Sequence, residues 1–311
     1  MSSITIYQPT GDKAVDTANL QHGLDNYDCV KIESEYIHNG LNVNRAGQII
    51  DCSGGNLIPG NIDAEIAINA VDVAAHNLKI HTTVAAERLL HINASGSVFH
   101  NLQINANNAV DAVEITNATG TKFFGGNIKG NLGTKTQNSA GLKIGELGGY
   151  EVKLFGTTIH HWEVGLKITS PGSIDDLFLS GCNLENNSIH GIHFHPDSIG
   201  VIYNLTIIGS HFEGSPTYLN IGENGRILSG LITSNRFSGE STIIRSYGGL
   251  QGITVCNNYA KTSTTGVVYD LNGVQVLHVY NSNNIWNGYD LATGSMANHL
   301  ISVDALAVMV V

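Results

Sequence analysis

The sequence has few charged residues and few prolines. Only 13% of its 311 residues are Asp, Glu, Lys or Arg, and five are proline, whereas 42% are hydrophobic. Intrinsic disorder requires the opposite balance, low hydrophobicity with high charge, so the chain is expected to fold. A chain of this length can bury a large core.

Basic residues are scarce too. Fifteen Lys and Arg stand against 26 Asp and Glu, for a formal net charge of −11. Nucleic acid is not expected as a partner, because a phosphate backbone is bound by clustered cations. No apolar run approaches the ~20 residues of a membrane span, so no membrane segment is expected. The N-terminus lacks a basic stretch followed by an apolar run, and no signal peptide is predicted.

Cysteine is rare, and its positions show no metal-ligand spacing. Cys29, Cys52, Cys182 and Cys256 lie far apart in the chain. We interpret them as free and mostly buried thiols, with a bridge between Cys29 and Cys52 as the alternative. No cofactor is predicted.

Glycine and asparagine, by contrast, are abundant, and both tolerate the positive φ of tight turns. One phrase recurs along the chain: a short alternating strand, a small or Asn corner, then one or two apolar residues. An internal repeat of about 26 residues, as here, is typical of a solenoid. The copies end at Ile80, Ile104, Ile128, Ile159, Leu184, Phe212, Phe237, Tyr259 and Ile285.

A second phrase lies between these copies, as in AVEIT, GLKIG, GLKIT and GIHFH. Its apolar residues alternate with polar ones, the period of a half-buried strand. We predict an all-β fold, a single right-handed parallel β-helix over residues 28–311 with three strands per turn and about 10 to 11 turns. Ile80, Ile104 and Ile128 should form an inward ladder. A propeller blade is longer, and a leucine-rich repeat needs a Leu framework that is missing here.

Both ends of a solenoid need cover, because an open end exposes apolar ladders and unpaired strand edges. Residues 1–27 are predicted to form an opening segment with a short capping helix over Val15–Leu24, which Asp16 or Thr17 can begin. The other end, LAVMVV, has no polar cap. We expect a partner chain to cover it, or the chain to continue.

The two phrases together resemble the repeats of the pectate-lyase-like β-helix superfamily, over about residues 28 to 303. The opening GDKAVDTANLQHGLDNYDCVKIESEYIHNGLNV resembles that of phage tailspike depolymerases, although their usual GDG reads GDK here. The resemblance implies a polysaccharide depolymerase, either lyase or glycosidase, that acts on an acidic bacterial surface polysaccharide. It also implies a homotrimer and a virion (phage tail) or extracellular location. The alternative is a non-catalytic carbohydrate-binding or structural module of a phage tail or adhesin.

In this superfamily the GLKI strand usually lines the sugar-binding groove. Its outward residues here recur every 23 to 29 positions, so each should lie one turn above the last. Lys143 and Lys167 can neutralise a uronate carboxylate and acidify the proton at C5. His193 can transfer protons because its reference pKa lies near working pH. The candidate catalytic residues are Lys167, His193, Lys143 and Glu114, and the row also contains His91 and Asn220.

Loops beside this strand carry further candidates for substrate binding. Trp162 can stack on a sugar face, and histidines and carboxylates surround it. The same residues are a possible metal site, but their spacing matches no metal motif, and none is predicted. The substrate-binding set is His91, His161, Trp162, Glu163, His195, Asp197 and Asn220.

Two other interpretations remain open. A column of mixed charge on a solvent-facing strand is also what solubility would give. A glycosidase with paired carboxylates is the rival chemistry, and Asp175-Asp176 is similar to the double aspartate of polygalacturonases. The companion motifs of that family and the Trp-Ile-Asp-His motif of pectate lyases are missing, so a turn is the alternative for this pair. Further carboxylate candidates are Glu163, Glu185 and Glu213.

Overall fold

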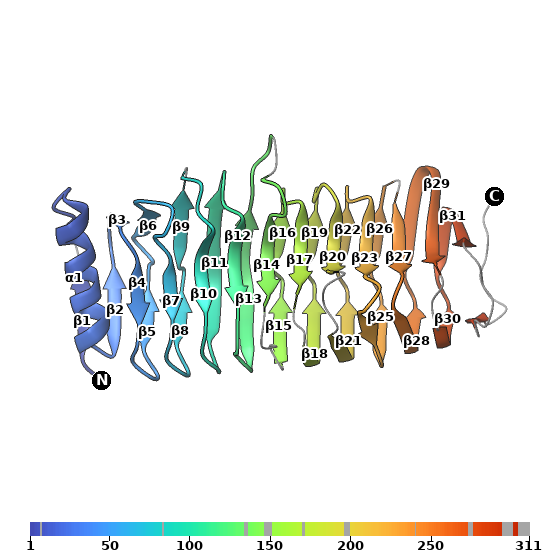
Figure 1. Cartoon of the computed structure of the whole chain (residues 1–311), viewed down its shortest axis with the longest axis horizontal. Coiled ribbons are helices and arrows are strands. Elements are labelled where there is room, and N and C mark those ends of the chain that lie inside the picture. Colours follow the sequence, from blue (N-terminus) through green and yellow to red (C-terminus); the bar gives the residue numbers. More distant parts are fainter. Residues whose placement is uncertain are drawn as a thin grey trace.

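The computed structural model describes residues 1–6, 8–82, 84–133, 136–145, 151–169, 172–195, 200–239, 241–272, 276–293 and 301–303. Within them the chain forms a helix, α1, and strands numbered β1 to β32, wound into a parallel β-solenoid of about 11 turns (Figure 1). All strand pairs described are parallel, as in β10 with β12 and β18 with β21. The parallel solenoid predicted from the repeat is therefore confirmed.

One column of paired strands, here called the first sheet, runs along the middle of Figure 1. Its strands carry the second sequence phrase, and each pairs with the equivalent strand of the next turn. They are β4 (Leu41–Val43), β7 (Ile66–Ile68), β10 (Arg88–Ile92), β12 (Asp111–Ile115), β14 (Ala140–Ile144), β17 (Val164–Ile168), β20 (His190–Phe194), β23 (Thr217–Ile221), β27 (Thr242–Ser246) and the second part of β29 (Tyr259–Leu271).

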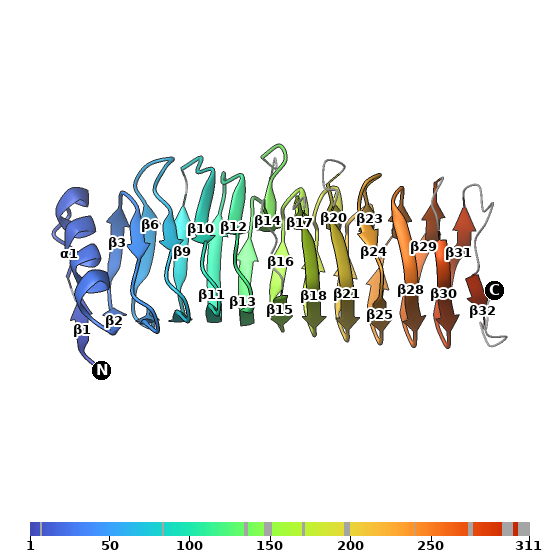
Figure 2. The same cartoon turned by 60° about the horizontal axis from the view of Figure 1, so that its bottom comes forward.

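The second sheet follows the first in chain order, and its later strands lie along the lower part of Figure 2. It holds β1 (Ser3–Ile6), β2 (Cys29–Ile32), β5 (Ile49–Asp51), β8 (Ala74–His76), the first parts of β11 (Val98–Ala106) and β13 (Thr121–Lys129), β15 (Glu151–Phe155), β18 (Ser173–Ser180), β21 (Val201–Ile208), β24 (Arg226–Ile227), β25 (Gly230–Thr233), β28 (Gly249–Cys256), β30 (Val276–Ser282) and β32 (Ile301–Val303).

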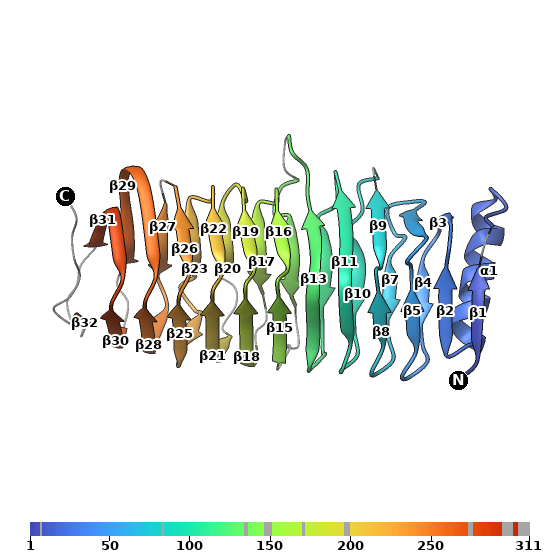
Figure 3. The same cartoon turned by 180° about the vertical axis from the view of Figure 1, so that it is seen from behind.

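The third sheet lies beside the second, and Figure 3 shows its strands β16, β19, β22 and β26 above those of the second sheet. Its strands are β3 (Glu35–His38), β6 (Asn56–Pro59), β9 (Lys79–Thr82), the second parts of β11 and β13, β16 (Thr158–His160), β19 (Asn183–Glu185), β22 (His211–Glu213), β26 (Arg236–Ser238), the first part of β29, and β31 (Ile285–Thr293). The last part of β31 pairs with the first-sheet part of β29.

Positive-φ residues form the corner between the second and third sheets. Glycine and asparagine dominate there because they adopt this conformation at low cost. The corner residues are Asn77, Asn101, Gly125, Gly156, Gly181, Gly209, Ser234, Asn257 and Asn283.

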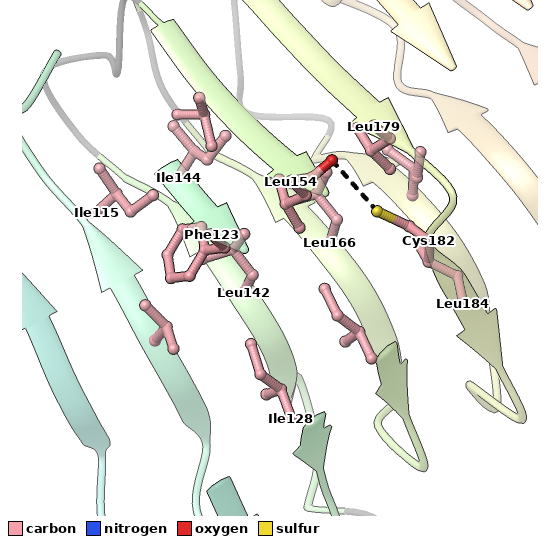
Figure 4. Packing of buried hydrophobic residues seen from close by; sticks show 14 of the residues in the cluster. Ile115, Phe123, Ile128, Leu142, Ile144, Leu154, Leu166, Leu179, Cys182 and Leu184 are labelled. Carbon is pink, nitrogen blue, oxygen red and sulfur yellow. Dashed lines mark hydrogen bonds between the residues drawn. The ribbon is translucent and has the colours of Figure 1, made fainter. Parts of the chain in front are cut away.

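The core consists of apolar ladders. Ile80, Ile104 and Ile128 are 1%, 2% and 0% exposed and lie opposite one another, so the predicted inward ladder is confirmed. Figure 4 shows the neighbouring packing in the middle turns, where the Cys182 thiol donates to the carbonyl oxygen of Leu154 at 3.4 Å.

The last two copies of the repeat differ from the prediction by one residue. Phe237 lies opposite Ala260, and Ala260 lies opposite Trp286. Tyr259 and Ile285, which we placed at the apolar position, are instead 39% and 46% exposed.

Helix α1 (Lys13–Asn26) lies at the N-terminal end of the solenoid (Figure 1). It begins before the predicted start, because Asp12 caps it by accepting hydrogen bonds from the backbone N–H groups of Ala14 and Val15. Leu20 and Leu24 are buried, and the helix contacts β3 and β4.

All four cysteines are free thiols, and no bridge joins Cys29 to Cys52. Cys52 and Cys182 are buried, and Cys29 and Cys256 are half-buried. Burial raises the pKa of the Cys52 thiol to about 12, so this thiol is chemically quiet.

Candidate functional site

The predicted row lies along the outer side of the first sheet. Each of its members is paired directly with the next, so residues spread over 130 positions of chain form one continuous column. The column continues beyond the prediction, because Asn220 lies opposite Arg245 and Arg245 opposite Asp270. The residues of this first-sheet row are His91, Glu114, Lys143, Lys167, His193 and Asn220.

Glu114 lies between two cations. Its Oε2 accepts from Arg88 Nη1 at 2.6 Å, and Lys143 Nζ lies 2.9 Å from its Oε1. Burial alone would raise the pKa of Glu114, which is 7% exposed, but Lys143 and Arg88 hold it below its usual value. An ionised, doubly paired carboxylate positions its neighbours better than it transfers protons.

Asp111 is an ionisable residue of this region that the sequence interpretation missed, as is Arg88. It begins β12, is 6% exposed, and its Oδ2 lies 3.3 Å from Lys143 Nζ. Burial raises its pKa to about 6, although Lys143 and Lys167 lower it. Its Oδ1 is buried without a hydrogen-bond partner in the described part of the chain. Such a carboxyl can accept or donate a proton near neutral pH.

The two lysines of the row differ in their partners. Lys143 pairs with both Asp111 and Glu114, which raise its pKa although burial opposes them. Lys167 Nζ donates to the carbonyl oxygen of Asn138 at 3.2 Å and forms no ion pair within the described residues. Burial lowers the pKa of Lys167 and the charge of Lys143 adds to that effect, although the charges of Asp111 and Glu163 oppose it. Lys167 is therefore the lysine of the two whose charge an anionic ligand would neutralise.

His193 lies in a cluster of imidazoles. Its ring centroid is 4.5 Å from that of His190 and 5.9 Å from that of His195. Asn220 Nδ2 donates to its Nδ1 at 2.8 Å, so Nε2 carries the ring proton. Burial, together with His190, His195 and Lys167, lowers the pKa of His193 to about 3. His193 therefore does not titrate near its reference pKa, and the prediction that it transfers protons near neutral pH is not supported. The residue is a neutral hydrogen-bonding group.

Trp162 does not lie on the surface. It is 2% exposed, and its indole N–H donates to the carbonyl oxygen of Ile128 at 3.1 Å. The ring is part of the core, so the expectation that it stacks on a sugar is wrong.

Other flanking candidates lie beside the row. Glu163 Oε2 accepts a hydrogen bond from the backbone N–H of Asn138 at 2.5 Å. The carbonyl oxygen of Asn138 accepts a hydrogen bond from Lys167 Nζ. His161 occupies a corner with a φ of 64°, and its Nδ1 lies 2.6 Å from that of His160. Asp197, the remaining candidate, lies outside the described residues.

The rival carboxylates belong to other faces. Asp175 and Asp176 lie within β18 of the second sheet, so they form part of a strand and not a turn. Glu185 and Glu213 lie opposite each other on the third sheet, and His211 is 3.4 Å from the first and 3.5 Å from the second. None of these four contributes to the first-sheet row.

Among the described residues, no group of three or more His, Cys, Asp and Glu is placed to hold a metal ion. In the same part of the chain, no helix is long and apolar enough to cross a membrane. Comparison of the chain with protein-family models, curated proteins and solved structures finds no significant match. The function is therefore inferred from the geometry of the site.

Proposed function

We propose that this chain is a carbohydrate-active β-helix protein that depolymerises an acidic bacterial surface polysaccharide along its first sheet. The observation that carries the proposal is the environment of Lys167. This half-buried cation forms no ion pair among the described residues and lies one strand from the ion pair of Lys143 and Asp111. Lys143 is already neutralised by two carboxylates, so Lys167 is the group available to a uronate.

The same geometry suits β-elimination. Lys167 would bind the uronate carboxylate and so acidify the C5 proton. The ionised carboxyl of Asp111 would take that proton, because its pKa of about 6 leaves it largely deprotonated yet basic at neutral pH. The electron pair at C5 would form a double bond to C4 and expel the glycosidic oxygen, which takes a proton from water. Neutral His193 would hydrogen-bond a sugar hydroxyl.

The finer features of the fold belong to the same proposal. We infer a right-handed coil with three strands per turn, capped by α1, of the pectate-lyase-like kind and with a tailspike-like opening segment. The right-handed crossover of parallel strands supports the handedness. A homotrimer and a virion or extracellular location complete this proposal.

A non-catalytic carbohydrate-binding or structural module is the second candidate. It is favoured by the network around Glu114, in which Arg88 and Lys143 both pair with Glu114 and Lys143 also pairs with Asp111, without a ligand. In this case the row would bind a polysaccharide or act as a solvated face.

Incubation with acidic and neutral polysaccharides separates these functions. Polygalacturonate, alginate and acidic capsular polysaccharides are the acidic substrates, with amylose and dextran as neutral controls. An unsaturated product that absorbs ultraviolet light identifies a lyase. New reducing ends without an unsaturated product identify a hydrolase. Binding without any cleavage identifies a non-catalytic module. Absence of cleavage and of binding across the acidic panel would contradict the proposal.

A further inference from the structure

A separate hollow opens over the third sheet near the N-terminal end. Its volume is about 550 Å³. Strands β6 and β9 pair there through one residue pair, Leu57 with Ile80, whereas β3 with β6 and β9 with β11 each pair through four. The outward side chains of β9, β11 and β13 line much of this hollow, beside the interrupted pairing of β6 with β9.

These side chains form a polar grid, two on each of three strands. Gln103 lies opposite both Lys79 and Asn127, and Asn105 lies opposite both His81 and Lys129. The two lysines thus occupy opposite corners. Two strand spacings of ~4.8 Å and two residues of ~3.3 Å place them about 12 Å apart.

The two lysines of this grid have no carboxylate partner among the described residues. Within the described residues, neither Lys79 nor Lys129 forms an ion pair, although the chain carries a net charge of −11. The lining contains one carboxylate, that of Glu35, which accepts from Asn56 Nδ2 at 3.3 Å. Two unpaired cations on an acidic body indicate an anionic ligand.

The amides between the lysines are suited to hydroxyl groups. Asn105 Oδ1 is buried and accepts no hydrogen bond from the described residues. Asn127 Oδ1 accepts from His160 Nε2 at 2.8 Å, so its amide N–H₂ is the group that can donate to a ligand. A buried acceptor without a donor costs free energy that a ligand hydroxyl recovers.

We propose that this groove, separate from the first-sheet row, binds a short acidic oligosaccharide. Its carboxylates lie at Lys79 and Lys129, and its hydroxyls bind Gln103, Asn105 and Asn127. An acidic peptide fits less well, because the groove presents the face of a sheet, and a peptide strand pairs with a sheet edge. The groove holds the polysaccharide at a distance from the first sheet and does not require that sheet to be catalytic.

Isothermal titration calorimetry of the full chain tests this. The probes are tetrasaccharides of galacturonate, mannuronate and N-acetylneuraminate, with maltotetraose and tetraglutamate as controls. At least one acidic tetrasaccharide should bind, and more tightly than either control. Lys79→Gln with Lys129→Gln should weaken it at least tenfold, and Asn105→Ala severalfold, with unchanged melting curves.

Two matched variants locate the site. Lys261→Gln removes an exposed lysine elsewhere on the third sheet, and Lys167→Gln alters the first-sheet row. Lys261→Gln should leave the affinity within twofold. Lys167→Gln should affect only binding at the first-sheet row, and should leave binding at the groove of Lys79 and Lys129 within twofold. The inference is overturned if no acidic tetrasaccharide binds, or if tetraglutamate binds as tightly. It is also overturned if replacing Lys79 and Lys129 together leaves the affinity for the acidic tetrasaccharide unchanged. Loss confined to Lys167→Gln would place the ligand on the first sheet instead.

Discussion

Burial and local partners together decide the protonation state and the role of each polar residue on the first sheet. Lys143 and Lys167 hold equivalent positions on adjacent strands, yet one is paired with two carboxylates and the other with a backbone carbonyl. Asp111 and Glu114 share one strand, but burial raises the pKa of the first, whereas neighbouring cations lower that of the second. Local partners therefore assign different roles to similar residues.

Asp111 should make stability depend on pH in a specific direction. Its folded pKa of about 6 exceeds the reference value of 3.8, so its stabilising contribution is complete below pH ~4 and is lost as pH rises through ~6. Asp111→Asn has no such titration. The free energy of unfolding of the wild type relative to this variant should fall by about 3 kcal/mol across that window. Chemical denaturation at a series of pH values measures the difference.

Asp175→Asn is the matched control, because Asp175 is exposed on the second sheet. The free energy of unfolding of the wild type relative to Asp175→Asn should show no comparable fall between pH 4 and 6. A parallel pH dependence for the wild type and Asp111→Asn would show that Asp111 titrates normally.

The sequence identified the residues of the row but not their chemistry. Spacing alone placed Lys143 opposite Lys167 and His193 opposite Lys167, because a solenoid repeats its strands at a regular interval. It could not show that Trp162 faces inward or that the pKa of His193 is lowered, since both depend on packing across turns. Asp111 was missed because a lone Asp at a strand start has no sequence signal.

Strands near the C-terminal end are joined by a ladder of buried asparagines. Asn258 Oδ1 accepts from the backbone N–H of Asn235 at 2.9 Å, and its Nδ2 donates to the carbonyl of Ile232 at 2.8 Å. Asn284 repeats the arrangement on the next turn. Each amide thus satisfies the backbone of a corner that lies out of reach of water.

Asn258→Ala should therefore destabilise the solenoid strongly. It leaves a buried N–H and a buried C=O unsatisfied, at a cost of about 2–4 kcal/mol. Asn183→Ala is the matched control, because Asn183 is half-buried on the third sheet and its Nδ2 lies 3.5 Å from Thr158 Oγ1. The control should cost less than about 0.5 kcal/mol. Equal thermal melting points for the two variants would show that the ladder contributes little.

The same ladder explains the register error at the last two copies of the repeat. The pattern predicts that the first apolar residue after an Asn pair points inward, which selects Tyr259 and Ile285. The second Asn of each pair, Asn258 or Asn284, points inward instead. Because side chains alternate along a strand, the next inward residues are Ala260 and Trp286.

At the scale of the whole molecule, a row of aromatic rings runs along part of the second sheet. Neighbouring ring centroids lie 4.9 to 5.3 Å apart; the first three pairs are stacked and the fourth is tilted by 42°. On later strands of the same sheet, Leu231 and Tyr280 are 37% and 50% exposed. Surfaces of this kind favour association between chains. The rings of this row are those of His76, His100, Phe124, Phe155 and Phe178.

The protein is predicted to be a homotrimer, with this face among its contacts. Light scattering at micromolar concentration should give about 99 kDa, three times the 33.1 kDa of the chain. Phe124→Lys with Leu231→Lys should shift the mass towards the monomer. Phe124→Leu with Leu231→Val should not, because the apolar face is kept. A wild-type mass near 33 kDa would contradict the trimer.

Activity of first-sheet variants is the most direct test of the central claim. On the acidic polysaccharide that the wild type cleaves, Lys167→Ala and Asp111→Asn should each lower turnover ~100-fold or more. His193→Ala should mainly raise the half-saturating concentration, because a neutral imidazole binds and does not transfer protons. Lys261→Ala, on an exposed site of the third sheet, should retain full activity. If the three first-sheet variants keep wild-type turnover, sugar affinity and melting curves, the row is a solvated face and not a carbohydrate site.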